Sequence, residues 1–232
     1  MYSLTIDTSN HVLGVALMKG NKVIGEFVTN LAKNHSVRLM PAVDQLMKEV
    51  DASPEQLDKI IVAKGPGSYT GVRIGLTTAK TLAWALDIPV VGVSSLKALA
   101  YQGRFYNSVI CPFFDARRGL VYTGLYEWQT NEMVAVHKEQ NILMYDWLTE
   151  LSKREQEVLF LSPDIEGFSD AIQEKLGDLA IIPEDMFHIA KPSDLALAGS
   201  HQESESTHHL TPNYLRLAEA EANWIKTQGD SK

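Results

Sequence analysis

The chain has 232 residues, is 45% hydrophobic and 22% charged, and carries a net charge of −8. This composition is typical of a soluble globular protein with one large or two small domains. Residues 1–7 lack the pattern of a signal peptide, and no apolar run approaches the roughly 20 residues of a membrane span, so neither is expected. The single cysteine, Cys111, excludes an internal disulfide and is predicted to be buried, in a reducing compartment.

The charge is unevenly distributed along the chain. Residues 1–103 carry 10 Lys and Arg against 8 Asp and Glu, a balance of +2, whereas residues 104–232 carry 11 against 21, a balance of −10. An acidic second half argues against wide, independent binding to nucleic acid, which requires clustered Lys and Arg. The change in charge also indicates two parts that meet near Gly103.

The first half is predicted to alternate strands with helices. Apolar residues at three- and four-residue steps predict a helix over 37–50, in which Pro41 indicates a kink or a late first turn. The other predicted elements are a strand meander at 4–6, 12–18 and 22–29, a short helix after Ser53, strands at 60–63 and 89–93, and helices at 77–86 and from Ser94 toward Tyr101.

A glycine-rich segment, GPGSYTGVRIG at residues 65–75, joins the strand at 60–63 to the helix at 77–86. Glycines at a strand-to-helix turn allow a close approach to an anion or to a partner's backbone. They equally allow the strand and the helix of the same chain to pack tightly. The segment has neither the Gly-Lys-Ser/Thr ending of a P-loop nor the spacing of a dinucleotide fingerprint, so both interpretations stay open.

The pattern restarts after Gly103. Its predicted elements are strands at 109–114, 120–127, 133–140 and 157–161, helices at 144–152 and 168–176, a polar loop at 200–209 and a final helix over about 214–225. Both halves therefore open with an apolar strand, an Asp at the turn and two further strands. We predict an α/β protein with a duplicated meander and two similar lobes, residues 1–103 and 104–232.

This plan resembles the superfamily of actin, hexokinase and the chaperone ATPases. The resemblance implies that the first hairpin of each lobe grips phosphate and that an Asp at the turn holds Mg²⁺ through water. Asp7 and Asp115 occupy these two places. Asp7 has a second interpretation, as an Asx-turn residue that closes its hairpin. Arg117 and Arg118 stand where a phosphate loop requires small residues, and the chain has no Gly-Gly pair to cradle adenosine, so a complete ATPase site is not expected.

Other catalytic chemistry has no signature in the chain. There is no His-Glu-x-x-His or His-x-x-x-His metal motif and no Gly-x-Ser-x-Gly nucleophile elbow. The helices at 37–50 and after Gly71 carry more apolar residues than one sheet face requires. Packing on their own sheet explains much of this, and a second, exposed stripe for partner helices is the alternative.

Several ordered motifs resemble the bacterial TsaB family, also called YeaZ, over nearly the whole chain. They are Ile6-Asp7-Thr8-Ser9, His35-Ser36 with Leu39-Met40-Pro41, the segment 65–75, Asp115-Ala116-Arg117 with Val121-Tyr122, and Pro212-Asn213-Tyr214-Leu215-Arg216 with Ala220-Glu221. The family loop within 65–75 is its most specific block, with Gly65, Pro66, Gly67, Ser68, Tyr69, Thr70, Gly71 and Arg73.

The resemblance implies a two-lobed actin-like fold and a cytoplasmic, non-catalytic subunit. Its implied partners are the catalytic relative TsaD and the small ATPase TsaE, with a homodimer when the chain is alone. Together they form threonylcarbamoyladenosine at position 37 of tRNAs reading codons that start with A, and tRNA is met only through the complex. The catalytic relative holds its metal with a His-x-x-x-His segment, and the matching residues 93–99 contain no histidine, so no metal, catalytic residue or glycoprotease activity is expected here.

The resemblance also implies site residues. The first-lobe helices, at about 36–50 and 71–86, are expected to form a helical bundle with the partner, through Leu39, Met40, Val43, Leu46, Met47, Val72 and Leu76. Asp7, Thr8 and Ser9 are expected either to contact ATP or ADP at the partner interface, or only to shape their hairpin. No cofactor of the chain's own is expected. The alternative function is a free-standing actin-like ATPase or small-molecule kinase that uses Asp7 and Asp115.

Overall fold

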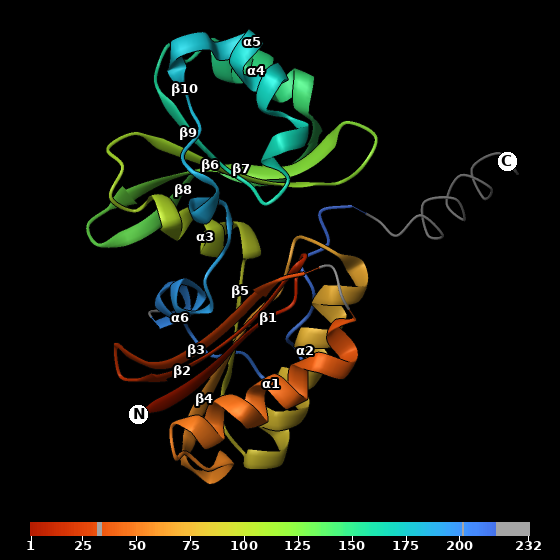
Figure 1. Cartoon of the computed structure of the whole chain (residues 1–232), viewed down its shortest axis with the longest axis vertical. Coiled ribbons are helices and arrows are strands. Elements are labelled where there is room, and N and C mark those ends of the chain that lie inside the picture. Colours follow the sequence, from red (N-terminus) through yellow and green to blue (C-terminus); the bar gives the residue numbers. More distant parts are fainter. Residues whose placement is uncertain (32–33, 201, 217–232) are drawn as a thin grey trace, which may run out of the picture.

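The structure is a computed structural model that describes residues 1–31, 34–200 and 202–216. It has two lobes, each built on a five-stranded sheet, and Figure 1 shows the first lobe below the second. Within the described ranges, none of the helices combines the length and apolar character that a bilayer crossing requires.

The first sheet has the strand order β3-β2-β1-β4-β5. β2 is antiparallel to both β1 and β3, because tight turns join these three strands, whereas β4 is parallel to β1 and β5 is parallel to β4. The strands are β1 (Tyr2–Asp7), β2 (Val12–Lys19), β3 (Lys22–Asn30), β4 (Leu57–Ala63) and β5 (Val90–Val93).

The second sheet repeats this topology. Its order is β8-β7-β6-β9-β10, again with two antiparallel pairings followed by two parallel ones. The strands are β6 (Val109–Asp115), β7 (Leu120–Gln129), β8 (Glu132–Leu143), β9 (Val158–Leu161) and β10 (Ala180–Ile181). The matching order and strand directions confirm the predicted two-lobed actin-like fold with a duplicated meander.

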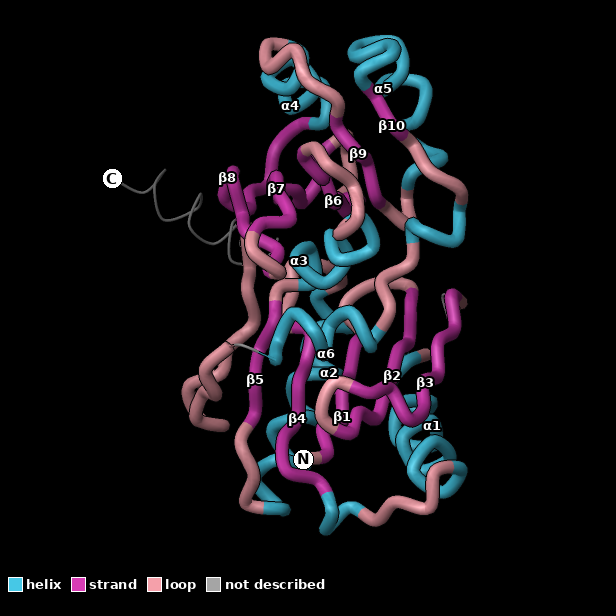
Figure 2. Tube along the Cα trace, turned by 90° about the vertical axis from the view of Figure 1, so that its left-hand side faces the viewer, coloured by secondary structure: helices cyan, strands magenta, loops and turns pink. Residues whose placement is uncertain are grey.

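The helices and sheets form alternating layers (Figures 1 and 2). α1 (His35–Glu49) and α2 (Tyr69–Leu86) cover the outer face of the first sheet, and α4 (Met144–Ser152) and α5 (Ser169–Leu176) cover the outer face of the second. α3 (Ser95–Ala100) and α6 (Pro192–Ser200) lie between the two sheets. Each sheet is therefore covered on both faces.

The two-residue period of the strands distributes each apolar run between these layers. On β4, Ile60 and Val62 pack against α1 and α2, whereas Ile61 and Ala63 join the cluster between the sheets. On β6, Cys111 packs in the outer cluster with α4 and α5, as its predicted burial requires. A strand that is buried on both faces reads as a continuous apolar run, which is why β4 and β6 were recognisable from the sequence.

Both first-lobe helices begin earlier than predicted. α1 begins at His35, where the Asn34 side chain accepts a hydrogen bond from the Ser36 backbone N–H, and it includes Pro41. α2 begins at Tyr69, because the Ser68 side chain caps it, so most of the glycine-rich segment is helix rather than loop. Glycine at 71 and 75 weakened the helical signal.

Six of the seven residues of the predicted partner-binding stripe on these helices are buried, contrary to the expectation that they are exposed to a partner. Only Met40 is exposed, at 44%. The others form the core between α1, α2 and the first sheet, because α1 and α2 turn their most apolar faces inward: Leu39, Val43, Leu46, Met47, Val72 and Leu76.

The end of the chain returns to the first lobe, contrary to the prediction that residues 104–232 form the second lobe. α6, which was not predicted, packs against the first sheet, and a Cβ on its Gly199 would lie 2.7 Å from a methyl carbon of Ile61. Glu205 forms a β-bridge with Val90 at the edge of that sheet, and the Asn213 N–H donates 2.7 Å to the Lys64 carbonyl. Of the predicted final helix, residues 214–216 are not helical and residues 217–225 lie outside the described residues.

Candidate functional site

The first hairpin turn is closed by its own side chains. Asp7 Oδ1 accepts hydrogen bonds from the backbone N–H of Ser9 at 2.8 Å and from its hydroxyl at 2.7 Å. Asp7, Thr8 and Ser9 are all at most 1% exposed, and burial raises the pKa of the Asp7 carboxyl. The geometry is that of an Asx turn, which is the second interpretation that the sequence allowed for Asp7.

The glycine-rich segment holds this hairpin turn. The Ser68 N–H donates 2.7 Å to the Ser9 carbonyl, and the Thr8 hydroxyl donates 2.7 Å to the Gly71 carbonyl. A Cβ on Gly71 would overlap the Thr8 carbonyl oxygen, and one on Gly75 would lie 2.6 Å from Thr8 Oγ1. These glycines therefore serve close packing within the chain, one of the two interpretations left open by the sequence.

Gly65 and Arg73 connect the same segment to the C-terminal residues. Gly65 adopts a φ of 92°, with the Asn213 carbonyl close beside it. The Arg73 guanidinium lies 3.9 Å from the centroid of the Tyr69 ring and donates a 2.7 Å hydrogen bond to the Tyr214 hydroxyl. The two tyrosine rings stack with centroids 5.4 Å apart. This hydrogen bond and both rings hold the pKa of Arg73 above its usual value.

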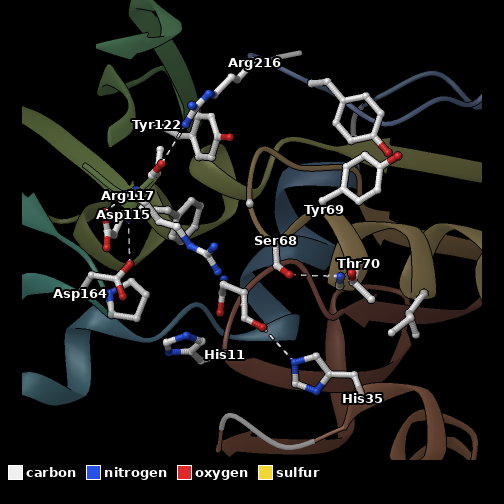
Figure 3. A pocket seen from close by; sticks show the side chains of 18 of the residues that line it. His11, His35, Ser68, Tyr69, Thr70, Asp115, Arg117, Tyr122, Asp164 and Arg216 are labelled. Atoms are coloured by element: carbon white, nitrogen blue, oxygen red, sulfur yellow. Dashed lines mark hydrogen bonds between the residues drawn. The ribbon is translucent and has the colours of Figure 1, made fainter. Parts of the chain in front are cut away.

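A cleft of about 890 Å³ opens between the two lobes, beside these groups (Figure 3). Both hairpin turns, the first turns of α1 and α2, and the C-terminal segment contribute to it. Its lining residues are Asn10, His11, Asn34, His35, Gly67, Ser68, Tyr69, Thr70, Gly71, Ile74, Phe114, Asp115, Ala116, Arg117, Arg118, Tyr122, Pro163, Asp164, Tyr214 and Arg216.

The second hairpin turn presents its Asp to the cleft, whereas the first contributes Asn10 and His11 but not its Asp. Asp115 is exposed, and its Oδ1 accepts a 2.7 Å hydrogen bond from the Arg117 N–H. The Asp115 N–H in turn donates 2.9 Å to Asp164 Oδ2. Asp7 does not line the cleft, so the structure does not bring the two predicted phosphate-loop acids together at one surface.

Several lining residues were not predicted as site residues. Asp164 follows β9, and Tyr122 lies on β7, where it appeared only within a family motif. Tyr214 and Arg216 appeared only within a family motif. Their contribution depends on the return of the C-terminal segment, which no local pattern encodes.

The segment that matches the metal-binding histidines of the catalytic relative has a structural role here. Ser94 caps α3, and its hydroxyl donates to Glu139 of β8. The same carboxylate accepts hydrogen bonds from the Tyr126 hydroxyl at 2.5 Å and from the Asn213 side chain at 2.8 Å. Burial and then the charge of Glu139 raise the pKa of Tyr126 well above its usual value. Within the described residues, no three His, Cys, Asp or Glu side chains gather as a metal site would require.

Comparison with known sequences places the chain in a family. The model of the TsaD family, tRNA N6-adenosine threonylcarbamoyltransferase, matches residues 22–224. The tRNA threonylcarbamoyladenosine biosynthesis protein TsaB of Bacillus subtilis (strain 168) is 51% identical over 228 residues, which are 98% of this chain and 100% of that protein. TsaB of Escherichia coli (strain K12) is 31% identical over 64% of this chain and 70% of its own length.

Solved structures agree with this assignment. YeaZ from Pseudomonas aeruginosa has the same fold, with a TM-score of 0.76 at 24% identity over 92% of this chain and 99% of its own. A further Pseudomonas aeruginosa protein, described as similar to peptidase YEAZ, has a TM-score of 0.79 at 26% identity, over 93% of this chain and 99% of its own. Identity to a curated TsaB along almost the entire length shows that this chain belongs to the TsaB (YeaZ) family.

Proposed function

We propose that this protein is the non-catalytic partner subunit in the formation of threonylcarbamoyladenosine at position 37 of tRNA. In this proposal it supports a catalytic subunit of the TsaD type and works with the small ATPase TsaE. The 51% identity to a tRNA threonylcarbamoyladenosine biosynthesis protein over the full length of that relative is the observation that carries it.

The state of the first hairpin supports an accessory role. A hairpin that grips phosphate must present its backbone N–H groups and its Asp to the cleft, whereas Asp7 is buried and accepts its hydrogen bonds from Ser9. We infer that the chain holds no nucleotide cofactor of its own and that ATP or ADP enters through the partner interface.

The outward side of α1 and α2 is the proposed docking face for the catalytic subunit. On α1, Val37 and Met40 lie one turn apart and are 64% and 44% exposed. On α2, Thr77 and Thr81 are exposed, and short side chains let a partner helix approach closely. Trp84, 71% exposed, lies on the same helix, and exposed Trp is a common binding hot spot. The same face is proposed to pair two copies when the partner is missing.

The test is size-exclusion chromatography with light scattering, after the pure chain is mixed with the TsaD homologue of its own organism. A peak of one-to-one mass is expected. The double variant Val37→Glu with Met40→Glu should weaken the complex by about tenfold or more, with an unchanged melting temperature, because both side chains are exposed. Tyr145→Glu, at a 72% exposed position on α4, is the matched control.

Two unchanged peaks for the wild-type mixture, with TsaE and nucleotide present, would contradict the proposal. Steady ATP turnover by the pure chain, lost in Asp7→Ala, would then favour a free-standing ATPase or small-molecule kinase. If the double variant still forms the complex, the docking face does not include the outward side of α1.

A further inference from the structure

The cleft between the lobes concentrates arginine in an acidic protein. The chain has a net charge of −8, yet Arg117, Arg118 and Arg216 line the cleft and Arg73 lies at its rim, four of the seven arginines in the sequence. Among the residues that the structure describes, no lysine lines it. Arginine, with its planar guanidinium, is the residue that most often pairs with phosphate and stacks on bases.

Two acidic residues, Asp115 and Asp164, line the same cleft. Asp115 and Asp164 each accept a hydrogen bond from a backbone N–H of the loops around the second hairpin. Among the described residues, neither Arg117 nor Arg216 takes part in an ion pair. The Arg216 guanidinium donates a hydrogen bond to the Ala116 carbonyl, at 3.2 Å, which places it beside the second hairpin (Figure 3).

The backbone holds this hairpin in an unusual conformation. Arg117 and Arg118 have φ values of 67° and 58°, in the left-handed region that non-glycine residues rarely adopt, and Gly119 follows with 74°. Asn and Gly suit such a turn better than Arg. The hairpin thus keeps an unfavourable backbone conformation that places arginines at the cleft. Such a conformation at a cleft indicates a function for these arginines.

The rim of the cleft supplies stacking surface. Tyr69 and Tyr214 both line it, are 45% and 43% exposed, and are held together by Arg73. Exposed aromatic rings beside a cationic groove are the usual arrangement for single-stranded nucleic acid, in which bases stack and arginines follow the backbone. The cleft volume of about 890 Å³ is large enough to admit a nucleotide.

We propose that this cleft binds a single-stranded segment of RNA, with Arg117 and Arg216 on its phosphates and Tyr69 and Tyr214 beneath its bases. The inference rests on the proposed function, because the RNA in question is the tRNA that the complex modifies. It gives the chain a direct contact with tRNA, whereas the resemblance implied contact only through the complex.

The test uses a fluorescein-labelled anticodon stem-loop RNA with an adenosine at position 37. Its binding to the complex of this chain with its TsaD-type partner is followed by anisotropy, at several salt concentrations. Arg117→Glu should weaken binding about tenfold and lower the salt slope, and Tyr69→Ala should weaken it about fivefold or more. Arg154→Glu, the same charge change at an exposed position after α4, should leave affinity within about twofold.

Light scattering on the same samples separates this inference from the proposed function. RNA affinity lost while the one-to-one complex remains is the expected result. Equal RNA affinity in Arg117→Glu and wild type would overturn the inference and leave the assembly role standing. Loss of the complex itself in Arg117→Glu would overturn it too, because the cleft would then be a protein contact. Displacement of the RNA by micromolar AMP or ATP would also overturn it, in favour of a mononucleotide site.

Discussion

Three glycines, at positions 67, 71 and 75, allow the first hairpin turn to pack directly against the start of α2. A Cβ at Gly67 would overlap the Ser9 carbonyl, and one at Gly71 would overlap the Thr8 carbonyl. Because these positions lack side chains, the hairpin turn lies directly on the start of α2, and Asp7 faces the interior. The segment that resembles an anion loop is in this protein a contact between two parts of one lobe.

Gly71→Ala is expected to destabilise the protein by about 1–3 kcal/mol, because the added methyl group meets backbone that must shift. Urea unfolding gives the free energy. Gly167→Ala is the control, since a Cβ there meets nothing within 4 Å, and it should change stability by less than about 0.5 kcal/mol. Equal effects of the two substitutions would show that the hairpin is not held by close packing.

Asp194 gives stability a dependence on pH. Its carboxylate accepts hydrogen bonds from Arg104, at 2.9 Å, and from Gln102, yet burial raises its pKa to about 6, despite the opposing charge of Arg104. The unfolded value is about 3.9. Between these values the folded state holds a proton that the unfolded state has lost, so this group lowers stability as the pH rises from about 4 to about 6, by about 3 kcal/mol in total.

Asp194→Asn should remove this part of the pH dependence. Urea unfolding of both proteins at several pH values from about 4 to 7 measures the difference. The wild-type free energy of unfolding is expected to fall relative to that of the variant over this range, and Asp7, whose pKa is also raised, acts in the same direction in both proteins. Parallel pH profiles would show that Asp194 is charged throughout.

At the scale of elements, α1 has two sides with opposite roles. Leu39, Val43 and Leu46 lie in the core, and a Cβ on Gly25 of β3 would come within 2.6 Å of a Leu46 methyl carbon. Val37 and Met40 face outward. The periodicity identified the helix correctly, but it did not state which apolar residues meet the sheet.

Leu46→Glu should therefore unfold the first lobe instead of only preventing assembly. A buried, unpaired carboxylate costs several kcal/mol, roughly comparable with the 5–15 kcal/mol stability of a whole domain. A circular dichroism melt measures it, with the exposed neighbour Gln45→Glu as the control. A variant that melts like the wild type would place Leu46 at the surface.

At the scale of the whole molecule, the second lobe is an insertion between β5 and α6 of the first. Leu195 and Ala196 of α6 are buried between the sheets, and residues 205–213 border the first sheet and α2. Glu139 of β8 adds a polar link through Ser94 and Asn213. The first lobe is therefore not a contiguous stretch of sequence, whereas the second lobe is.

A fragment of residues 1–103 is expected not to fold cooperatively, because the inner face of its sheet, including Ile61 and Val93, loses α6. Joining residues 190–216 to it through a flexible linker should restore a thermal transition, followed by circular dichroism. A cooperative transition in the short fragment alone would show that the first lobe is complete without the returning segment.

The sequence by itself determined the kinds of elements, their order, the duplication and the family. These depend on local periodicity and on short motifs, which are present in the chain whether or not it is folded. It also contains a local signal for α6, since Pro192 at the first helical position followed by Asp194 is a typical helix start.

Only the tertiary structure decided which face of α1 and α2 is buried, what the glycines pack against, and which residues line the cleft. Each depends on contacts between residues far apart in the chain, such as Thr8 with Gly71 and Arg216 with Ala116. An apolar stripe has the same period whether it faces its own sheet or a partner, and an Asp at a turn has the same identity whether it points inward or toward a ligand. The choice between them is made by packing, which no local pattern records.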